Sequence, residues 1–136
     1  MKRLALAAAV AATAATMLGL DLLWLGAVAR GFYDGELGAL RRDGVFWPAA
    51  LAFYGLYVTA IVWHAVAGAS DTRSAMLRGA RLGLLAYGTY ELTNWAVLRG
   101  WPGALVPVDI AWGVVLTALA AGAGQRAHDA VLSRDT

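Results

Sequence analysis

Four long apolar stretches, three of which contain a single acidic residue, limit what this chain can fold into. The stretches cover residues 4–29, 48–69, 79–98 and 107–124. A helix needs about 20 predominantly apolar residues to cross the hydrocarbon core of a bilayer. Each stretch is close to that length. The sequence therefore predicts an all-α integral membrane protein, a four-helix bundle formed by a single membrane domain over residues 1–136.

Composition supports a membrane protein and excludes several other classes. Hydrophobic residues make up 60% of the chain and charged residues 15%, against about 45–50% and 25% in soluble domains. The chain contains no cysteine, which excludes disulfides and thiolate metal ligands. Its formal net charge is only +2, and its basic residues lie mainly between the apolar stretches. This distribution does not predict a nucleic-acid partner.

Basic residues flank the predicted spans unevenly. Seven Lys or Arg residues fall on the side of the two termini and four on the opposite side. Because cytoplasmic loops are enriched in Lys and Arg, we expect a multi-pass protein of the inner (cytoplasmic) membrane with both termini in the cytoplasm. Lys2 and Arg3 also resemble the start of a signal peptide. The first apolar stretch is longer than the hydrophobic region of a typical signal peptide, so we expect it to be retained as a helix.

The connectors carry two further structural signals. In residues 30–47, apolar side chains recur at helical spacing along one face: Phe32, Tyr33, Leu37 and Leu40. This pattern predicts a short interfacial helix between the first and second spans. Before the third stretch, the segment Ser70-Asp71-Thr72 is typical of a capped helix N-terminus.

Three acidic side chains are predicted to lie in the outer half of the membrane. At 1.5 Å per residue, Asp21 lies about 12 Å, Glu91 about 10 Å and Asp109 about 3 Å inside the outer end of its helix. Since a charge at membrane depth costs about 2.5 kcal/mol or more, we expect these carboxyls to face the bundle interior and to share protons. Arg30 and Arg99 lie just beyond the outer helix ends, from which their side chains can reach inward.

Aromatic and amide side chains share the depth and the helix faces of the acids. The predicted ligand-binding or proton-handling site therefore comprises Asp21, Trp24, Tyr54, Tyr87, Tyr90, Glu91, Asn94, Asp109 and Trp112. His64 lies toward the other end of the second stretch, and we expect it to pack outside this site. The site residues predict no metal and no cofactor.

The residue types leave several functions open. We favour the binding or transport of a small cationic or amphiphilic ligand, or of protons, because carboxyls and aromatic rings both attract cations. One alternative is a membrane enzyme or accessory subunit acting on lipids or isoprenoids, with a carboxyl as general acid or base. Nucleophile-elbow, phosphate-loop and metalloprotease motifs are absent from the sequence.

Two non-catalytic alternatives also stay open. The first is an assembly partner that binds a second copy of this chain or a larger membrane protein through its small-residue faces. The second is a polar clamp, in which the same acids and amide only fix the helix register through interhelical hydrogen bonds. In every case membrane lipids are expected partners.

Several short motifs occur in order along most of the chain. They include Leu20-Asp21-Leu22-Leu23-Trp24-Leu25, Phe53-Tyr54, Tyr87-Gly88-Thr89-Tyr90-Glu91-Leu92-Thr93-Asn94 and Asp109-Ile110-Ala111-Trp112-Gly113. With these motifs the chain resembles the bacterial membrane proteins of domain-of-unknown-function family 2177. The resemblance implies a four-helix membrane protein and assigns no activity. That family commonly has Asp where this chain has Glu91, and the longer side chain implies a carboxyl that exchanges hydrogen bonds rather than holding a metal rigidly.

Overall fold

The computed structural model describes residues 1–135, and within that range the regular secondary structure is helical. The α-helices are α1 (Lys2–Leu23), α2 (Arg30–Leu37), α3 (Trp47–Ile61), α4 (Thr72–Val97) and α5 (Leu105–Leu132). π-helical turns extend α1 and α3 over Trp24–Val28 and Val62–Val66, and short 3-10 turns follow α2 and α5 over Gly38–Leu40 and Ser133–Asp135.

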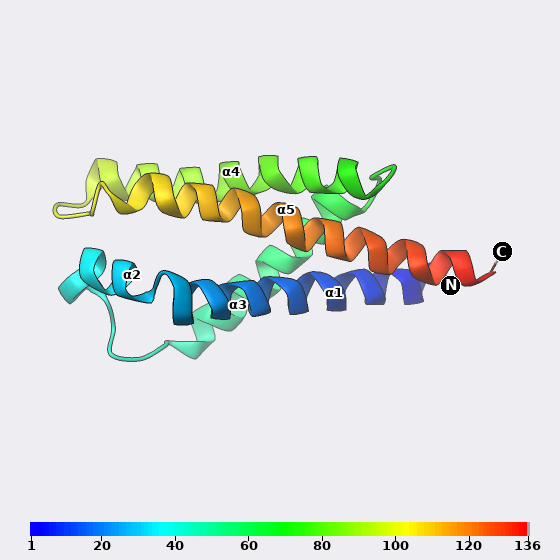
Figure 1. Ribbon diagram of the computed structural model, residues 1–136, viewed down its shortest axis with the longest axis horizontal. Helices are drawn as coiled ribbons and strands as arrows, with labels where there is room; N and C mark the ends of the chain where they lie inside the picture. Colours follow the sequence, from blue (N-terminus) through cyan, green and yellow to red (C-terminus); the bar gives the residue numbers. More distant parts are fainter. Residues whose placement is uncertain (136) are drawn as a thin grey trace.

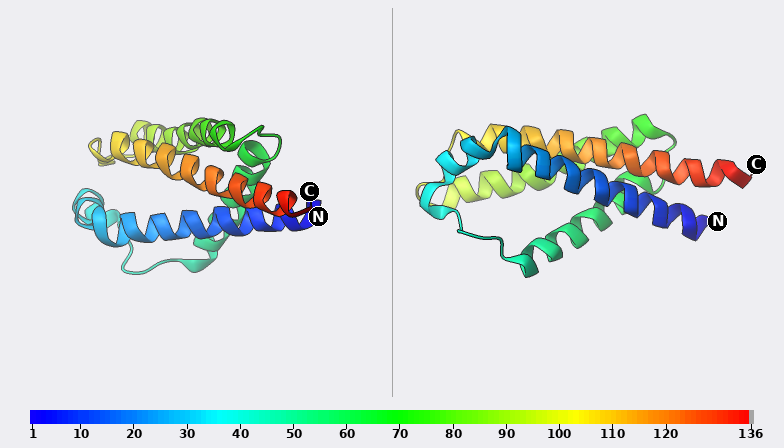
Figure 2. Two further views of the ribbon diagram at one scale, coloured as in Figure 1. Left: turned by 45° about the vertical axis from the view of Figure 1, so that its right-hand side comes forward. Right: turned by 60° about the horizontal axis from the view of Figure 1, so that its bottom comes forward.

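Three long helices run side by side along the molecule. α5 packs between α1 and α4, and α3 crosses them obliquely (Figure 1). The first half of α3 diverges from the other helices, whereas its last turns rejoin them (Figure 2). Both chain termini lie at one end of the molecule together with the α3–α4 connector. Residues 30–46 and 98–104 form the opposite end, called the α2 end below.

Glycines allow α4 and α5 to approach closely. A Cβ atom added to Gly79 would lie 2.6 Å from the carbonyl oxygen of Thr117 and 2.8 Å from Cβ of Ala121. A Cβ added to Gly83 would meet the backbone of Gly113. Because neither position has room for a side chain, the α4 backbone rests directly on α5. This is the small-residue packing that holds helices together in lipid.

Large apolar side chains cover the exterior of the protein. The buried core includes Met17, Ile61 and Leu116 among many alanines. By contrast, Leu56 and Val97 are 74% and 75% exposed. Soluble monomers rarely expose large continuous apolar surfaces. An exterior of this kind is compatible with contact to lipid chains.

Three helical stretches are long and apolar enough to cross a membrane: Lys2–Val28, Trp47–Val66 and Leu105–Leu132. α4 is not among these three, and it carries Arg73, Arg78, Arg81 and Glu91. The fourth predicted span is therefore present as a helix, but not as an equally apolar one.

The helices extend beyond several of the predicted stretches. The sequence predicts a third span that begins at Gly79, yet α4 begins at Thr72. The carboxylate of Asp71 accepts a hydrogen bond from the backbone N–H of Ser74 at 2.8 Å, which confirms the predicted cap. The arginines after this cap favour helix as strongly as many apolar residues. Charge therefore marks where an apolar stretch ends and does not mark where the helix begins.

Candidate functional site

A cavity of about 400 Å³ lies at the α2 end, and each α-helix contributes to its wall. The three acids predicted to share one depth, Asp21, Glu91 and Asp109, all line it. Its other lining residues are Leu25, Tyr33, Leu37, Arg41, Phe53, Tyr54, Tyr87, Tyr90, Trp101, Leu105 and Trp112. The fold thus brings carboxyls from α1, α4 and α5 to the wall of one cavity.

Asp21 joins three helices. One of its carboxyl oxygens accepts a hydrogen bond from the Tyr54 hydroxyl of α3 at 2.8 Å, and the other accepts from the Trp112 indole N–H of α5 at 3.1 Å. The Trp112 ring stacks on Trp24, with centroids 4.5 Å apart and planes 7° from parallel. Helical periodicity explains this placement, because Met17 and Asp21 are one turn apart on the buried face of α1.

Asp109 is held by a tyrosine from outside the long helices. The Tyr33 hydroxyl of α2 donates to Asp109 Oδ1 at 2.5 Å, and the Trp24 indole N–H donates to the Tyr33 hydroxyl at 3.3 Å. Tyr33 packs with Ala29 and Leu105 in a small apolar cluster. Burial, reinforced by the bond to Asp109, raises the pKa of the Tyr33 hydroxyl. This hydroxyl therefore keeps its proton and serves as a donor.

Glu91 is the most deeply buried of the three acids, at 1% exposure. The indole N–H of Trp101, in the α4–α5 connector, donates to Glu91 Oε2 at 2.9 Å. The Trp101 ring also packs edge-on against Tyr90, with centroids 5.7 Å apart. The carboxyls of Glu91 and Asp109 line the same cavity. Two negative charges facing one cavity repel each other, and a proton on either carboxyl removes that repulsion.

The described hydrogen-bond donors to these three carboxyls are neutral groups of tyrosine and tryptophan. Arg41 is the basic residue on the cavity wall within residues 1–135, and it forms an ion pair with Asp34. Arg30, which the sequence allows to reach inward, lies 3.7 Å from the same aspartate in an exposed pair. The acids therefore outnumber the positive charge available to them. Such an excess of buried charge is costly unless protons or a positively charged group offset it.

The other predicted site residues take different places. Tyr87 lines the cavity and its ring covers Gly113 of α5. Tyr90 stands at the cavity edge and is 55% exposed. Asn94 does not line the cavity, and it lies one helical turn after Tyr90 on α4. The exposed side chain of His64 lies away from the site. Functional roles for all of these residues stay predictions.

Sequence reasoning missed Tyr33 and Trp101 as partners of the acids. Tyr33 lies in the predicted interfacial helix and Trp101 in the connector after the third predicted span, and aromatic rings at such places are typical of the membrane interface. A usable signal does exist: buried tyrosine hydroxyls and tryptophan N–H groups usually find a hydrogen-bond partner. Two such donors next to helix ends that carry acids therefore point toward those acids.

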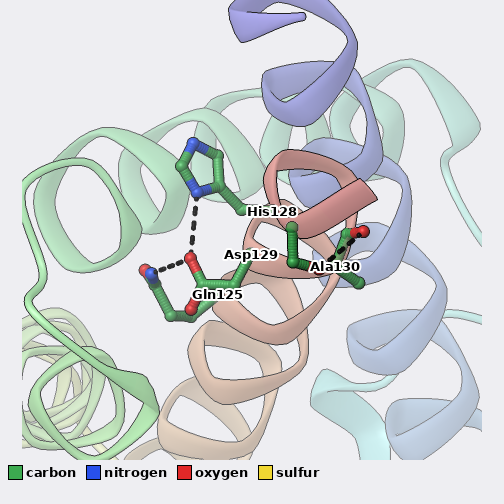
Figure 3. A network of polar contacts seen from close by, with 5 residues as sticks. Gln125, His128, Asp129 and Ala130 are labelled. Atoms are coloured by element: carbon green, nitrogen blue, oxygen red, sulfur yellow. Dashed lines mark hydrogen bonds and ion pairs between the residues drawn. The ribbon is translucent and has the colours of Figure 1, made fainter. Parts of the chain in front are cut away.

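A second polar network lies near the C-terminal end of α5 (Figure 3). The side-chain N–H of Gln125 donates to Asp129 Oδ1 at 2.9 Å, and Nδ1 of His128 lies 3.3 Å from the same oxygen. These contacts join residues of one helix within four positions, so they bring no second element to the network. In residues 1–135, no group of three or more His, Asp or Glu side chains is placed to hold a metal ion.

The helical fold, the apolar exterior and the three apolar stretches together define an all-α membrane protein. The chain matches the family DUF2177, described as predicted membrane protein, over residues 6–126, and it belongs to this family. This match confirms the resemblance seen in the sequence motifs. No curated protein and no solved structure matches the chain.

Proposed function

We propose that the protein binds a small organic cation, or the cationic head group of an amphiphile, in the carboxyl-lined cavity. One observation carries the proposal: three carboxyls line a single space in which their described donors are neutral. A cation in this space offsets charge that the protein leaves uncompensated. The ring of Trp112 and the tyrosines on the cavity wall add favourable cation–π contacts. Protons compete for the same carboxyls.

Equilibrium dialysis of labelled tetraethylammonium against the purified protein in detergent tests this proposal. We expect saturable binding that weakens at least tenfold in Asp109→Asn and in Glu91→Gln, because each change removes a negative charge facing the cation. Tenfold corresponds to about 1.4 kcal/mol. The matched control is Glu36→Gln, which removes one carboxylate from α2 outside the cavity. The absence of saturable wild-type binding at millimolar concentrations, or equal loss in all three variants, would refute the proposal.

We further propose that α4 is a fourth span of an inner-membrane protein, and that α2 lies at the outer surface of that inner membrane. With 26 residues, α4 is about 39 Å long, which exceeds the roughly 30 Å of the hydrocarbon core. It packs against α5 through Gly79 and Gly83. Its arginines lie in its first half, at the end that it shares with both termini. Their position favours a cytoplasmic location for that end.

Single cysteines report this topology directly, since the chain has none of its own. Gly44→Cys places a thiol in the connector before α3, and Ser70→Cys places one in the connector before α4. A membrane-impermeant maleimide added to spheroplasts is expected to label the first variant, and to label the second only after the cells are opened. The reverse pattern would invert the proposed orientation. Labelling of both thiols in closed cells would exclude an odd number of spans between them.

A further inference from the structure

A second cavity of about 300 Å³ adjoins the carboxyl-lined one. Its wall consists of Phe53, Ala86, Tyr87, Tyr90 and Asp109. Four of these residues also line the first cavity, whereas Ala86 lines only the second. Apart from the carboxyl of Asp109 and two tyrosine hydroxyls, the wall presents aromatic rings and hydrocarbon. Asp109 thus lies where the carboxyl-lined cavity and this more apolar cavity meet.

The apolar cavity lies between α3 and α4, where these two helices separate. The first half of α3 diverges from α4, and the gap widens toward the α2 end (Figure 2). Phe53 of α3 is 43% exposed and Tyr90 of α4 is 55% exposed. Both residues therefore border the exterior at this place. In a membrane, that exterior is the acyl-chain region.

An aromatic row separates this cavity from the core farther along α3. The rings of Phe53 and Tyr57 stack, with centroids 5.4 Å apart, and Tyr57 lies 6.2 Å from the ring of Tyr87. The hydroxyl of Tyr57 is hydrogen-bonded to Thr117 of α5 at 2.7 Å. Because Tyr57 is thus fixed to the core, the apolar cavity ends at this row. Its open directions are toward the carboxyls and toward lipid.

We propose that the cavity is loaded sideways from the bilayer by a single-chain alkylammonium amphiphile. Its cationic head lies among Asp21, Glu91 and Asp109, and its alkyl chain lies between Phe53 and Ala86, with its end in the bilayer. This inference rests on the proposed function, which it deepens by naming the ligand class and the route of entry. Along the lateral route the alkyl chain of the ligand stays in hydrocarbon throughout. Only its cationic head leaves the lipid head-group region. The acids it meets are the groups that most need a positive charge.

Filling the apolar cavity without touching the acids tests this inference. Ala86→Phe adds a ring to the wall that only this cavity has, and Ala86→Leu is a smaller second variant. Leu85→Phe is the matched control, since the neighbouring side chain is 67% exposed and lines neither cavity. The ligands are tetraethylammonium and decyltriethylammonium, which share a head group. Competition against labelled tetraethylammonium in lipid nanodiscs gives both dissociation constants.

We expect decyltriethylammonium to bind wild type more tightly than tetraethylammonium, partly because it concentrates in the bilayer. That enrichment is the same for every variant. Changes in the dissociation constant of tetraethylammonium divided by that of decyltriethylammonium therefore report the contribution of the apolar cavity to alkyl-chain binding. Ala86→Phe is expected to lower this ratio at least tenfold, and Ala86→Leu several-fold. In both variants the affinity for tetraethylammonium is expected to change less than threefold. Leu85→Phe is expected to change neither the ratio nor the affinity for tetraethylammonium.

Two results overturn the inference in distinguishable ways. If both Ala86 variants keep the wild-type ratio, the alkyl chain does not occupy the apolar cavity, yet the cation site stands. If wild type binds neither ligand, the proposed function fails and this inference fails with it. Retained tetraethylammonium binding in each variant serves as the check on folding.

Discussion

The contact between Gly79 and α5 makes a quantitative prediction for the substitution Gly79→Ala. The new methyl group would lie 2.6 Å from the carbonyl oxygen of Thr117 and 2.8 Å from Cβ of Ala121, whereas ordinary contact begins at 3.4 Å. The deficits are 3.4 − 2.6 = 0.8 Å and 3.4 − 2.8 = 0.6 Å. Since both obstacles belong to α5 and one is backbone, no side-chain rotation relieves them.

α4 must therefore move away from α5 by more than half an ångström. A gap of 0.5–1 Å forfeits about a quarter to a half of each dispersion contact along an interface, and overpacked sites typically lose about 1–3 kcal/mol. We expect Gly79→Ala to lower the free energy of unfolding by that amount. Titration of the detergent-solubilised protein with sodium dodecyl sulfate, followed by circular dichroism, measures it.

The matched control is Gly88→Ala in the same helix. Apart from its chain neighbours and the adjacent backbone of α4, no atom lies within 4 Å of the Cβ that this change adds. Ala is favoured over Gly in a helix by roughly 0.5–1 kcal/mol. We expect the control to be neutral or slightly stabilising. Equal stabilities of Gly79→Ala and Gly88→Ala would show that α4 and α5 do not touch as described.

Three further predictions concern the site and the start of α4. Trp101→Phe keeps a ring against Tyr90 but removes the N–H donor to Glu91, so we expect a loss of about 1–2 kcal/mol in the same titration. Asp71→Ala is expected to lower the thermal midpoint measured by circular dichroism. The bond from the Ser74 backbone N–H lowers the pKa of the Asp71 carboxyl. Its stabilisation is therefore fully present above the ordinary value of 3.8 and is lost as the pH falls through the lowered folded value. A wild-type advantage over Asp71→Ala that persists through that acid range would contradict this cap. Tetraethylammonium binding is expected to weaken as the pH falls, because protons compete for the carboxyls, and a pH-independent constant would argue against carboxylate recognition.

Periodicity and depth indicated several of the long-helix residues that line the cavity, but also Trp24 and Asn94, which do not line it. Asp21 and Trp112 lie at similar depths in their helices, and each shares a helix face with small residues. The helical repeat therefore directs both inward without knowledge of any neighbour. Glu91 and Asp109 follow from the same arithmetic.

Helical periodicity does not predict how the connectors fold or which way a uniformly apolar helix faces. Tyr33 and Trp101 reach their carboxyls because connectors fold back over the α2 end, and the path of a connector depends on tertiary contacts. The divergence of α3 was also unpredicted. Its residues are apolar on nearly all sides, with Leu51, Phe53 and Leu56 exposed, so no polar face indicates which side packs against the core.

Tyr33 and Trp101 belong to segments outside the three apolar stretches, yet they donate hydrogen bonds to two of the three cavity carboxyls, Asp109 and Glu91. In the proposed orientation these two segments sit among lipid head groups. Lateral pressure or surface charge in that layer then acts directly on these two hydrogen bonds, without first bending a helix. In that orientation, a change in membrane composition weakens or strengthens the hydrogen bonds to Asp109 and Glu91.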